Sequence, residues 1–589
     1  MGMIVKKQRD PRPCIHKSPT VEEQAKSDLE DPTIKMSLAK DPRPPHAGGY
    51  PITKSLGGMG FIPVNAIMKR LFIARKLYAS LTLSCLLMTA TLGEVRLPSI
   101  IGNHMVLQRE QANPIWGWAD AHESITLHIG DQRVQTQAAA DGGWKVTLDP
   151  LPVGGPYSMR IEGKNTLLLE NIMVGEVWIC SGQSNMQWSI NASNDPDLEK
   201  LTAHYPNIRL VTVPRVGTQE PQSDFEGQWQ PCSPETVGNF SAVGYFFGRQ
   251  LHQTLNIPIG LINNAWGGSA AEAWVRRDLL EADARYEPLL ERWKKTESDE
   301  ALLKAMSDYE AALETWESAA ATARGLGKDI PNRPRRPNNA LTGNHRPGNI
   351  YNGVLRPTIG YGIRGAIWYQ GESNAGRAYQ YRDLFPLMIQ NWRDVWGQGD
   401  FPFYWVQLAD FRMEKDQPSD SDWAELREAQ TMTMSRLPNT GEAVIIDLGE
   451  AQDIHPKNKE DVGKRLARWA LAREYGFDLV HQSPRYASME RQGSKIILSF
   501  DHVGGGLDLF DVQKPVGFTI AGADQQFQHA EGKILNQHQI EVWSESVAQP
   551  VAVRYAWADN PVCNVQNKEG LPLTPFRTDD WPGITINNH

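Results

Sequence analysis

The chain has 589 residues, more than one hydrophobic core ordinarily organises, so two or three domains are expected. Hydrophobic residues make up 40% of it and charged residues 22%, which is typical of a soluble globular protein. A net charge of −9 without a long basic run argues against nucleic acid as the main partner. Trp occurs 19 times, more often than Tyr or Phe; indole rings stack on sugars but also fill cores, so the count is only a weak hint of carbohydrate.

The N-terminal region resembles a targeting segment rather than a folded unit. Residues 1–67 are rich in Pro, Lys and Asp without a lasting apolar period, so we expect disorder or a start assigned too early. A basic stretch from Met68, an apolar body and small residues then predict a signal peptide at 68–93. The product would be exported, either periplasmic or secreted. A real extension before an internal signal-anchor is the alternative, and Cys85 leaves a lipid anchor as a minor one.

Cysteine usage excludes a disulfide framework. Cleavage near Glu94 would leave Cys180, Cys232 and Cys563, none of them in a Cys-x-x-Cys pair. At most one disulfide can form. No metal-ligand spacing of Cys or His is present, so no metal site is predicted.

Residues 94–170 show the pattern of a small β-sandwich. Short runs of alternating polarity are separated by Gly, Asp and Pro turns. The expected strands are Ile115–Trp118, Ser124–Ile129, Trp144–Leu148 and Tyr157–Ile161.

Residues 171–475 are expected to form an α/β domain, because apolar runs alternate with helical stretches as in a buried parallel sheet. The expected strands are Glu176–Cys180, Ile259–Ile262, Gly365–Tyr369, Phe403–Gln407 and Ala443–Ile446, and the expected helices include Ala242–Leu255 and Lys459–Tyr475. Residues 283–345, charged and helical and then Pro-rich, form an insertion that is either a lid or surface decoration. Residues 476–589 return to β character, and a second β-sandwich is expected there.

Two sequence blocks carry features of a nucleophile and an oxyanion site. In the first, an apolar strand runs into a turn that holds Ser184 at the start of a helix, where nearby N–H groups can stabilise an anion. Helix capping by Ser184 explains this block alone equally well. In the second, a strand ends at Gly267 and Gly268, whose backbone could approach a ligand closely. A plain strand-to-helix turn is the simpler interpretation of that block by itself.

The third and fourth blocks supply polar groups and a base. Gln370 could donate its amide to an oxyanion, while Glu372 and Asn374 could order the loop or contact substrate. His455 follows the last strand, and an imidazole is suited to activate a Ser hydroxyl because its pKa lies near 7. Such a base needs an acidic neighbour to fix its tautomer.

Two aspartates could provide that acid. Asp453, two residues before His455, is the nearer candidate, and Asp447 at the end of the strand is the second. Trp188, Trp266 and Trp368 lie beside the blocks and could form a sugar platform or belong to the core.

These blocks resemble those of the sialate O-acetylesterase family within the SGNH hydrolases. The matching segments are "GQSNM", "WGGS..E.W", "WYQGESNA" and "DIHPKNK", in the family's order, and the closing "RYAWADNPVCNVQNKEGLPLTPFRTD" resembles the family's tail. The resemblance implies a flavodoxin-like SGNH sheet domain flanked by two β-sandwiches. It also implies a serine esterase that removes O-acetyl groups from sugars without a cofactor.

The resemblance assigns roles to the residues singled out above. Ser184 would be the nucleophile and His455 the base, and the N–H groups of Ser184 and Gly268 with the Gln370 side chain would form the oxyanion hole. The resemblance leaves the acid open between Asp453 and Asp447, and we favour Asp453 because it lies nearer to His455. Two departures from the wider SGNH pattern stand out. Gln370 replaces the usual Asn, as in related carbohydrate acetylesterases. The acid usually lies three residues before the His, where this chain has Gln452.

The expected partner is an O-acetylated sugar or glycan, by resemblance a 9-O-acetylated sialic acid. Acetylated xylan or xyloglucan would suit the same mechanism. A noncatalytic glycan-binding protein with a degenerate core is the alternative from another class, but it predicts loss of Ser184 or His455, and both are present. No membrane span is expected in the mature chain.

Overall fold

The computed structural model describes residues 94–325, 330–335 and 340–589. The expected disordered segment 1–67 and signal peptide 68–93 lie outside these residues. Within the described part of the chain, no helix is long and apolar enough to cross a membrane.

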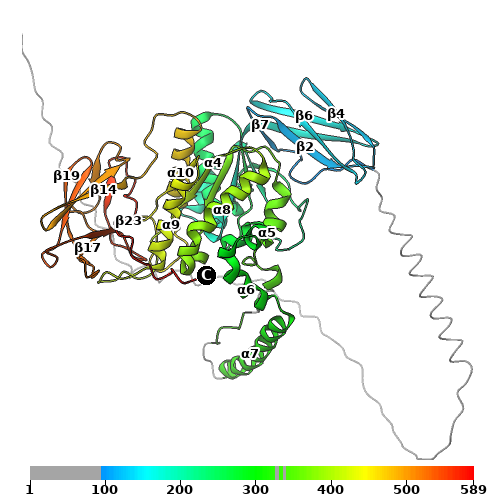
Figure 1. Cartoon of the computed structure of the whole chain (residues 1–589). Helices are drawn as coiled ribbons and strands as arrows, with labels where there is room; N and C mark the ends of the chain where they lie inside the picture. Colours follow the sequence, from blue (N-terminus) through cyan, green and yellow to red (C-terminus); the bar gives the residue numbers. More distant parts are fainter. Residues whose placement is uncertain (1–93, 326–329, 336–339) are drawn as a thin grey trace, which may run out of the picture. The chain divides into compact units, whose positions relative to one another are not determined.

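The first strands form the blue and cyan sheets of Figure 1. β2 (Asn113–Trp118) pairs with β5 (Gly143–Leu148), and β3 (Ser124–Ile129) pairs with β4 (Gln132–Gln137) and β6 (Gly154–Glu162), all antiparallel. Burial alternates along β2 and β3, as expected for strands with one face on a core. β4, which has no fully buried residue, was not predicted, because it lacks the apolar alternation that marks a strand.

One long strand joins these sheets to the centre of the molecule. β7 (Thr166–Gly182) pairs with β6 and with β1 (Val106–Gln108) in its first part, and with β10 and β11 further on. Its burial changes from alternating to continuous after Asn171. The expected boundary at residue 170 therefore falls inside a strand rather than in a linker.

The central part of the sheet has the strand order β13-β12-β11-β7-β10-β8-β9. All pairs from β13 to β8 are parallel, whereas β9 pairs antiparallel with β8. The remaining strands are β8 (Tyr205–Thr212), β9 (Gln230–Cys232), β10 (Ile259–Asn263), β11 (Gly365–Tyr369), β12 (Phe403–Val406) and β13 (Thr440–Ala443).

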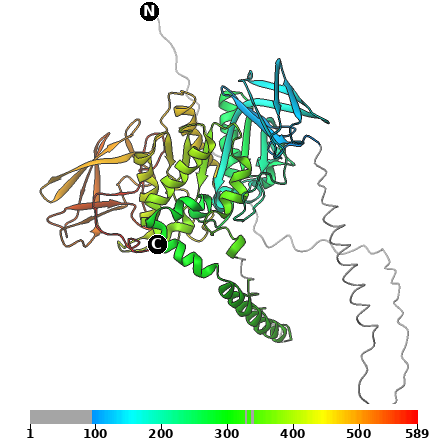
Figure 2. The ribbon, with the colours of Figure 1, turned by 45° about the vertical axis from the view of Figure 1, so that its right-hand side comes forward.

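Helices cover both faces of this sheet (Figures 1 and 2). Ile367 and Tyr369 of β11 pack in the core shared with α4 (Ala242–Leu255) and α10 (Lys459–Arg473). Ala366 and Trp368 point to the opposite core, with α8 (Ala378–Trp396) and α9 (Asp422–Arg436). Because the side chains of β11 point alternately into two buried cores, the sequence of this strand is one continuous apolar run.

The last parallel strand differs from its expected position. We predicted a strand at Ala443–Ile446, but β13 ends at Ala443. Val444 and Ile446 instead pack in the core of the C-terminal strands. Their apolar character is therefore explained by a second core and not by the central sheet.

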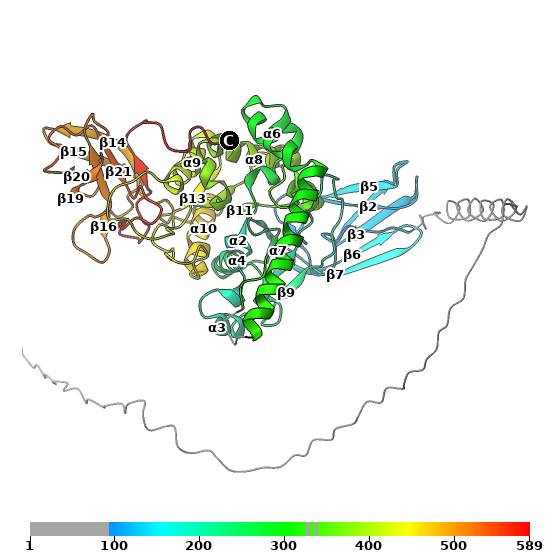
Figure 3. The same ribbon diagram turned by 90° about the horizontal axis from the view of Figure 1, so that it is seen from below.

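The region of the predicted insertion at 283–345 contains helices. α5 (Arg277–Glu281) precedes α6 (Glu287–Thr296) and α7 (Asp299–Gly325), which Figure 3 shows in green. Glu297 at the end of α6 forms ion pairs with Arg277 at 2.6 Å and with Arg346 at 2.8 Å. These ion pairs connect Glu297 to residues on either side of segment 283–345. Part of the Pro-rich piece lies outside the described residues.

The C-terminal strands form small antiparallel sheets around a core of their own. One has the order β14-β15-β20-β19, another β18-β17-β21-β23, and β16 pairs with β22. Their bounds are β14 (Arg485–Gln492), β15 (Lys495–Asp501), β16 (Leu507–Leu509), β17 (Phe518–Ala521), β18 (Gln528–His529), β19 (Glu531–Asn536), β20 (Gln539–Trp543), β21 (Ala552–Tyr555), β22 (Val565–Asn567) and β23 (Phe576–Arg577).

Candidate active site

The four sequence blocks meet at one edge of the central sheet. Ser184 follows β7, Gly268 follows β10, Gln370 follows β11 and His455 lies in the loop after β13. These strands are parallel, so their carboxyl ends lie along the same edge, where open α/β sheets bind ligands.

The turn that holds Ser184 depends on a glycine. Gly182 has a φ of +136°, and a Cβ there would collide with the carbonyl oxygen of Tyr369. Ser184 then begins the short helix α2 (Ser184–Gln187) and remains half-buried between the buried Gln183 and Asn185. Within the described residues the Ser184 N–H donates no hydrogen bond, so it is free to bind an anion.

The glycine pair lies against this turn. The Gly267 N–H donates to Gln187 Oε1 at 2.6 Å, and a Cβ on Gly267 would lie 3.4 Å from the Ser184 Cβ. Gly268 has a φ of +72°, and its N–H has no hydrogen-bond partner among the described residues. Asn344, which follows the insertion helices, donates to the Gly267 carbonyl at 2.6 Å. Two N–H groups are thus unused near the Ser184 turn.

The imidazole of His455 is held by neighbours on both sides. Its Nδ1 lies 3.4 Å from Asp453 Oδ1, which also accepts the His455 backbone N–H at 2.9 Å. The Trp188 ring stacks on the imidazole, with 4.6 Å between centroids and 11° between planes. Burial lowers the pKa of His455 below its ordinary 6.5, helped by the Lys459 ammonium and opposed by Asp453. The imidazole is therefore neutral at neutral pH, as a general base must be.

The contacts of the two candidate acids differ. Asp447 binds Arg465 with both carboxylate oxygens, each at 2.6 Å. Asp453, in contrast, is the carboxylate beside His455. The geometry therefore favours Asp453 over Asp447 as the acid.

The Gln370 amide is more tightly bound than its sequence position indicates. It is fully buried, and its Nε2 donates to the Ser269 carbonyl at 3.1 Å and to Asn374 Oδ1 at 2.7 Å. Its Oε1 accepts the Tyr381 hydroxyl at 2.9 Å. An oxyanion could accept a hydrogen bond from Gln370 Nε2 only by displacing the Ser269 carbonyl or Asn374 Oδ1. The role of Gln370 in the oxyanion hole therefore stays a prediction.

Asn374 orders the loops rather than facing a ligand, which corrects its place among the candidate substrate-binding residues. It is 1% exposed, accepts the Ala271 N–H at 2.9 Å and donates to Glu272 Oε2 at 3.0 Å. Glu272 in turn pairs with Arg377 at 2.6 Å. Glu372 is half-buried, and its Oε1 accepts a hydrogen bond from Asn185.

The three candidate platform tryptophans occupy different environments. Trp368 is fully buried and packs edge-on against Trp274 and Trp392, with centroids 5.4 and 5.8 Å away. It is a core residue, which corrects the expectation that it could bind sugar. Trp266 is partly buried and packs against the same core. Trp188 is half-buried and stacks on the candidate base.

Sequence reasoning did not single out Asn185, Lys459 or Asn344 as site residues. Asn185 and Lys459 lie inside the quoted blocks, directly after Ser184 and four residues after His455, and that proximity was the available signal. Asn344 lies beyond the insertion helices, where no local pattern marks it.

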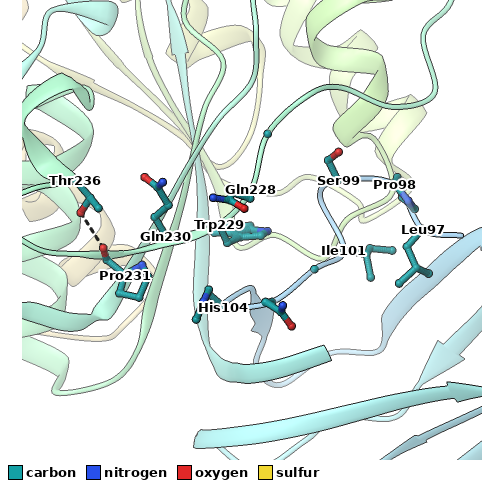
Figure 4. A pocket seen from close by; sticks show the side chains of 13 residues that line it. Leu97, Pro98, Ser99, Ile101, His104, Gln228, Trp229, Gln230, Pro231 and Thr236 are labelled. Atoms are coloured by element: carbon teal, nitrogen blue, oxygen red, sulfur yellow. Dashed lines mark hydrogen bonds between the residues drawn. The ribbon is translucent and has the colours of Figure 1, made fainter. Parts of the chain in front are cut away.

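Other cavities lie away from this site. Figure 4 shows one of about 470 Å³ lined by His104, Trp229 and Pro231 among others, and none of the predicted site residues lines it. In the described part of the chain, no cluster of three or more His, Cys, Asp or Glu side chains could hold a metal ion.

Comparison with known proteins shows the family to which the chain belongs. The family model "Carbohydrate esterase, sialic acid-specific acetylesterase" matches residues 174–317 and 346–472. A sialate O-acetylesterase from Rattus norvegicus is 31% identical over 536 residues, covering 82% of this chain and 94% of that protein. The Homo sapiens sialate O-acetylesterase is 28% identical over 548 residues, covering 84% and 94%. The crystal structure of a carbohydrate acetylesterase from Xanthomonas citri is 36% identical with a TM-score of 0.69, covering 83% of this chain and all of that one.

The mixed α/β fold and these similarities define a carboxylic ester hydrolase. More particularly, the chain belongs to the family of carbohydrate esterases described as sialic acid-specific acetylesterases.

Proposed function

We propose that this enzyme removes O-acetyl groups from sugars by acyl transfer through Ser184, with His455 as general base and Asp453 as its acidic partner. The carrying observation is the way the residues beside Ser184 hold the His455 loop. Asn185 donates to the carbonyl of Ile454 at 3.0 Å, and Trp188 stacks on the imidazole. These contacts join the turn that holds Ser184 to the loop that holds His455 at this edge of the sheet.

The first half of the reaction forms an acetyl-enzyme. The neutral His455 takes the Ser184 proton as Oγ attacks the acetyl carbonyl, and a tetrahedral oxyanion forms. The unused N–H groups of Ser184 and Gly268 would stabilise the oxyanion, with Gln370 as the third donor. Collapse breaks the bond to the sugar oxygen, which leaves with the proton from His455.

The second half repeats these steps with water. His455 removes a proton from water, and the hydroxide attacks the acetyl carbonyl on Ser184. Asp453 stabilises the imidazolium formed in each half. Acetate leaves, and Ser184 recovers its proton from His455.

The substrate we favour is O-acetylated sialic acid. The relatives from Rattus norvegicus and Homo sapiens, each matched over 94% of its own length, are named sialate O-acetylesterases. An acetylated plant polysaccharide such as xylan or xyloglucan is the second candidate. The similar Xanthomonas citri structure supports this second candidate, because it is described as a carbohydrate acetylesterase with no mention of sialic acid.

We further propose an SGNH arrangement, with a flavodoxin-like sheet domain between β-sandwiches at 94–170 and 476–589. The parallel order of the central strands and the separate core of the C-terminal strands support it. Export through a signal peptide at 68–93 is part of the same proposal, supported by the sequence pattern of that segment.

The test is acetate release by the purified protein from 9-O-acetylated sialic acid and from acetylated xylan, measured side by side. Ser184→Ala serves as the control. Release that disappears in this variant supports the esterase, and the preferred substrate identifies the sugar. No release from either substrate, or equal release by the variant, would contradict the proposal.

A further inference from the structure

Three side chains from different blocks form a largely buried polar network, and none of them takes part in the proton transfers described above. We call Asn185, Glu372 and Lys459 the amide network. Asn185 is 1% exposed and Lys459 is fully buried. Asn185 Oδ1 accepts from Lys459 Nζ at 2.6 Å, and Asn185 Nδ2 donates to Glu372 Oε1 at 2.6 Å. The network therefore connects α2, the short helix after β11, and α10.

The same amide connects the nucleophile turn to the base loop. Asn185 follows Ser184, and its Nδ2 also donates to the carbonyl of Ile454, which precedes His455. Both N–H bonds of the amide are thus used, one by each acceptor. A flipped amide would turn its NH2 group toward the Lys459 ammonium, which can only donate. Lys459 therefore dictates how the Asn185 amide is oriented.

Lys459 is held by little else. Among the described residues, no carboxylate lies within ion-pair distance of its Nζ, and Asn185 Oδ1 is the one hydrogen-bond acceptor recorded for it. Its ammonium lies 5.4 Å from the centre of the Tyr369 ring and 6.0 Å from that of Trp188. Burial of an ammonium with so few partners costs free energy of folding. We therefore infer that its contact with Asn185 has a function.

We propose that Asn185 and Lys459 are positioning residues, Asn185 by fixing the His455 loop against the Ser184 turn and Lys459 by fixing the Asn185 amide. This inference rests on the proposed roles of Ser184 and His455. Neither positioning residue touches the substrate, so its loss lowers kcat more than it changes KM. A displacement of about 1 Å in such a site can cost about 100-fold in rate.

The charge of Lys459 should also affect a second measurable quantity, the pKa of His455. Burial and the Lys459 ammonium lower the pKa of His455, and Asp453 raises it. Burial also lowers the pKa of Lys459 to about 7, opposed by the carboxylates of Glu372, Asp453 and Glu450. Removal of the ammonium therefore raises the pKa of His455, and the acidic limb of the rate profile moves to higher pH.

The experiment compares Lys459→Met with Lys464→Met in the full-length protein. Lys464 lies on the same helix, its side chain is 46% exposed, and it pairs with Glu460, so this control removes an equal charge outside the network. We expect Lys459→Met and Asn185→Ala to lower kcat about 10- to 100-fold, with KM within about threefold of wild type. The control should keep the wild-type kcat, KM and pH profile.

A second variant covers failure to fold. Lys459→Met removes an ammonium that favours the charged form of Glu372. Lys459→Met combined with Glu372→Gln removes both charges, and thermal unfolding verifies the fold of this double variant. A low kcat in this folded double variant supports the inference. A wild-type kcat in it would overturn the inference.

Titration of His455, followed by NMR of labelled histidine, tests this inference independently of the proposed function. If the wild-type protein releases no acetate, the proposed function fails, but the titration can still be measured. A His455 pKa that rises in Lys459→Met and not in Lys464→Met supports the contact between the network and the base. An unchanged titration would overturn it.

Discussion

Replacement of Asp453 by Asn tests which carboxylate supports the base. The change keeps the size of the side chain and removes its charge next to Nδ1 of His455. The imidazolium formed during acyl transfer then loses its stabilising partner, so kcat should fall. Because Asp453 raises the pKa of His455, the acidic limb of the rate profile should also move to lower pH.

The distance between the two groups sets the size of the effect. At 3.4 Å, two unit charges interact by about 1 kcal/mol in a water-like medium and about 5 kcal/mol at an effective dielectric constant of 20. The Asp453 side chain is 42% exposed and that of His455 is 25% exposed, so solvent screening places the interaction near the lower bound. We expect a loss of about 1–3 kcal/mol, or about 5- to 150-fold in kcat.

The assay is initial-rate acetate release over a range of substrate concentrations and pH. Asp447→Asn is the matched control, because both oxygens of Asp447 bind Arg465. It should change kcat less than about threefold, as expected for a carboxylate that does not contact the base. An Asp453→Asn enzyme with wild-type turnover, or an equal loss in Asp447→Asn, would refute the reasoning.

Three further predictions follow from the site. Gln370→Ala should lower kcat by about 10²- to 10³-fold, as loss of one oxyanion donor does, and a near-wild-type rate would contradict that role. In the wild-type enzyme, kcat/KM should fall on acidification with a midpoint below 6.5, because the lowered pKa of His455 keeps the base neutral down to that range; a midpoint above 6.5 would speak against it. Trp368→Ala should lower the free energy of unfolding by about 3–5 kcal/mol in denaturant unfolding, because Trp368 is fully buried. Trp188→Ala should instead lower kcat with a much smaller loss of stability, because Trp188 stacks on His455. The reverse pattern would contradict both assignments.

The central strands and the position of the site could be predicted from the sequence. β11 has the expected bounds, and Ser184 follows its strand as expected, because apolar runs that end in Gly or polar residues are local signals. The continuity of β7 could not be predicted, since its first half alternates like a surface strand and its second half is apolar throughout. No local pattern shows that such halves are one strand.

The contacts of individual side chains were harder to predict. The sequence leaves open whether Trp368 binds sugar or belongs to the core. The alternation of side chains along β11 places it in the core. Asn185 and Lys459 read like ordinary polar neighbours, and only the tertiary fold brings them together. The sequence blocks and their resemblance to a family could suggest candidate roles, whereas the hydrogen-bond network depends on residues far apart in the chain.

The most direct test of the central claim is to locate the nucleophile chemically. The protein is treated with a serine-directed fluorophosphonate, and the labelled peptide is identified by mass spectrometry while acetate release is followed. The account predicts one label, on Ser184, with loss of activity in proportion to labelling, and little labelling of a His455→Ala variant. A label on another residue, or a fully labelled enzyme that still releases acetate, would contradict it.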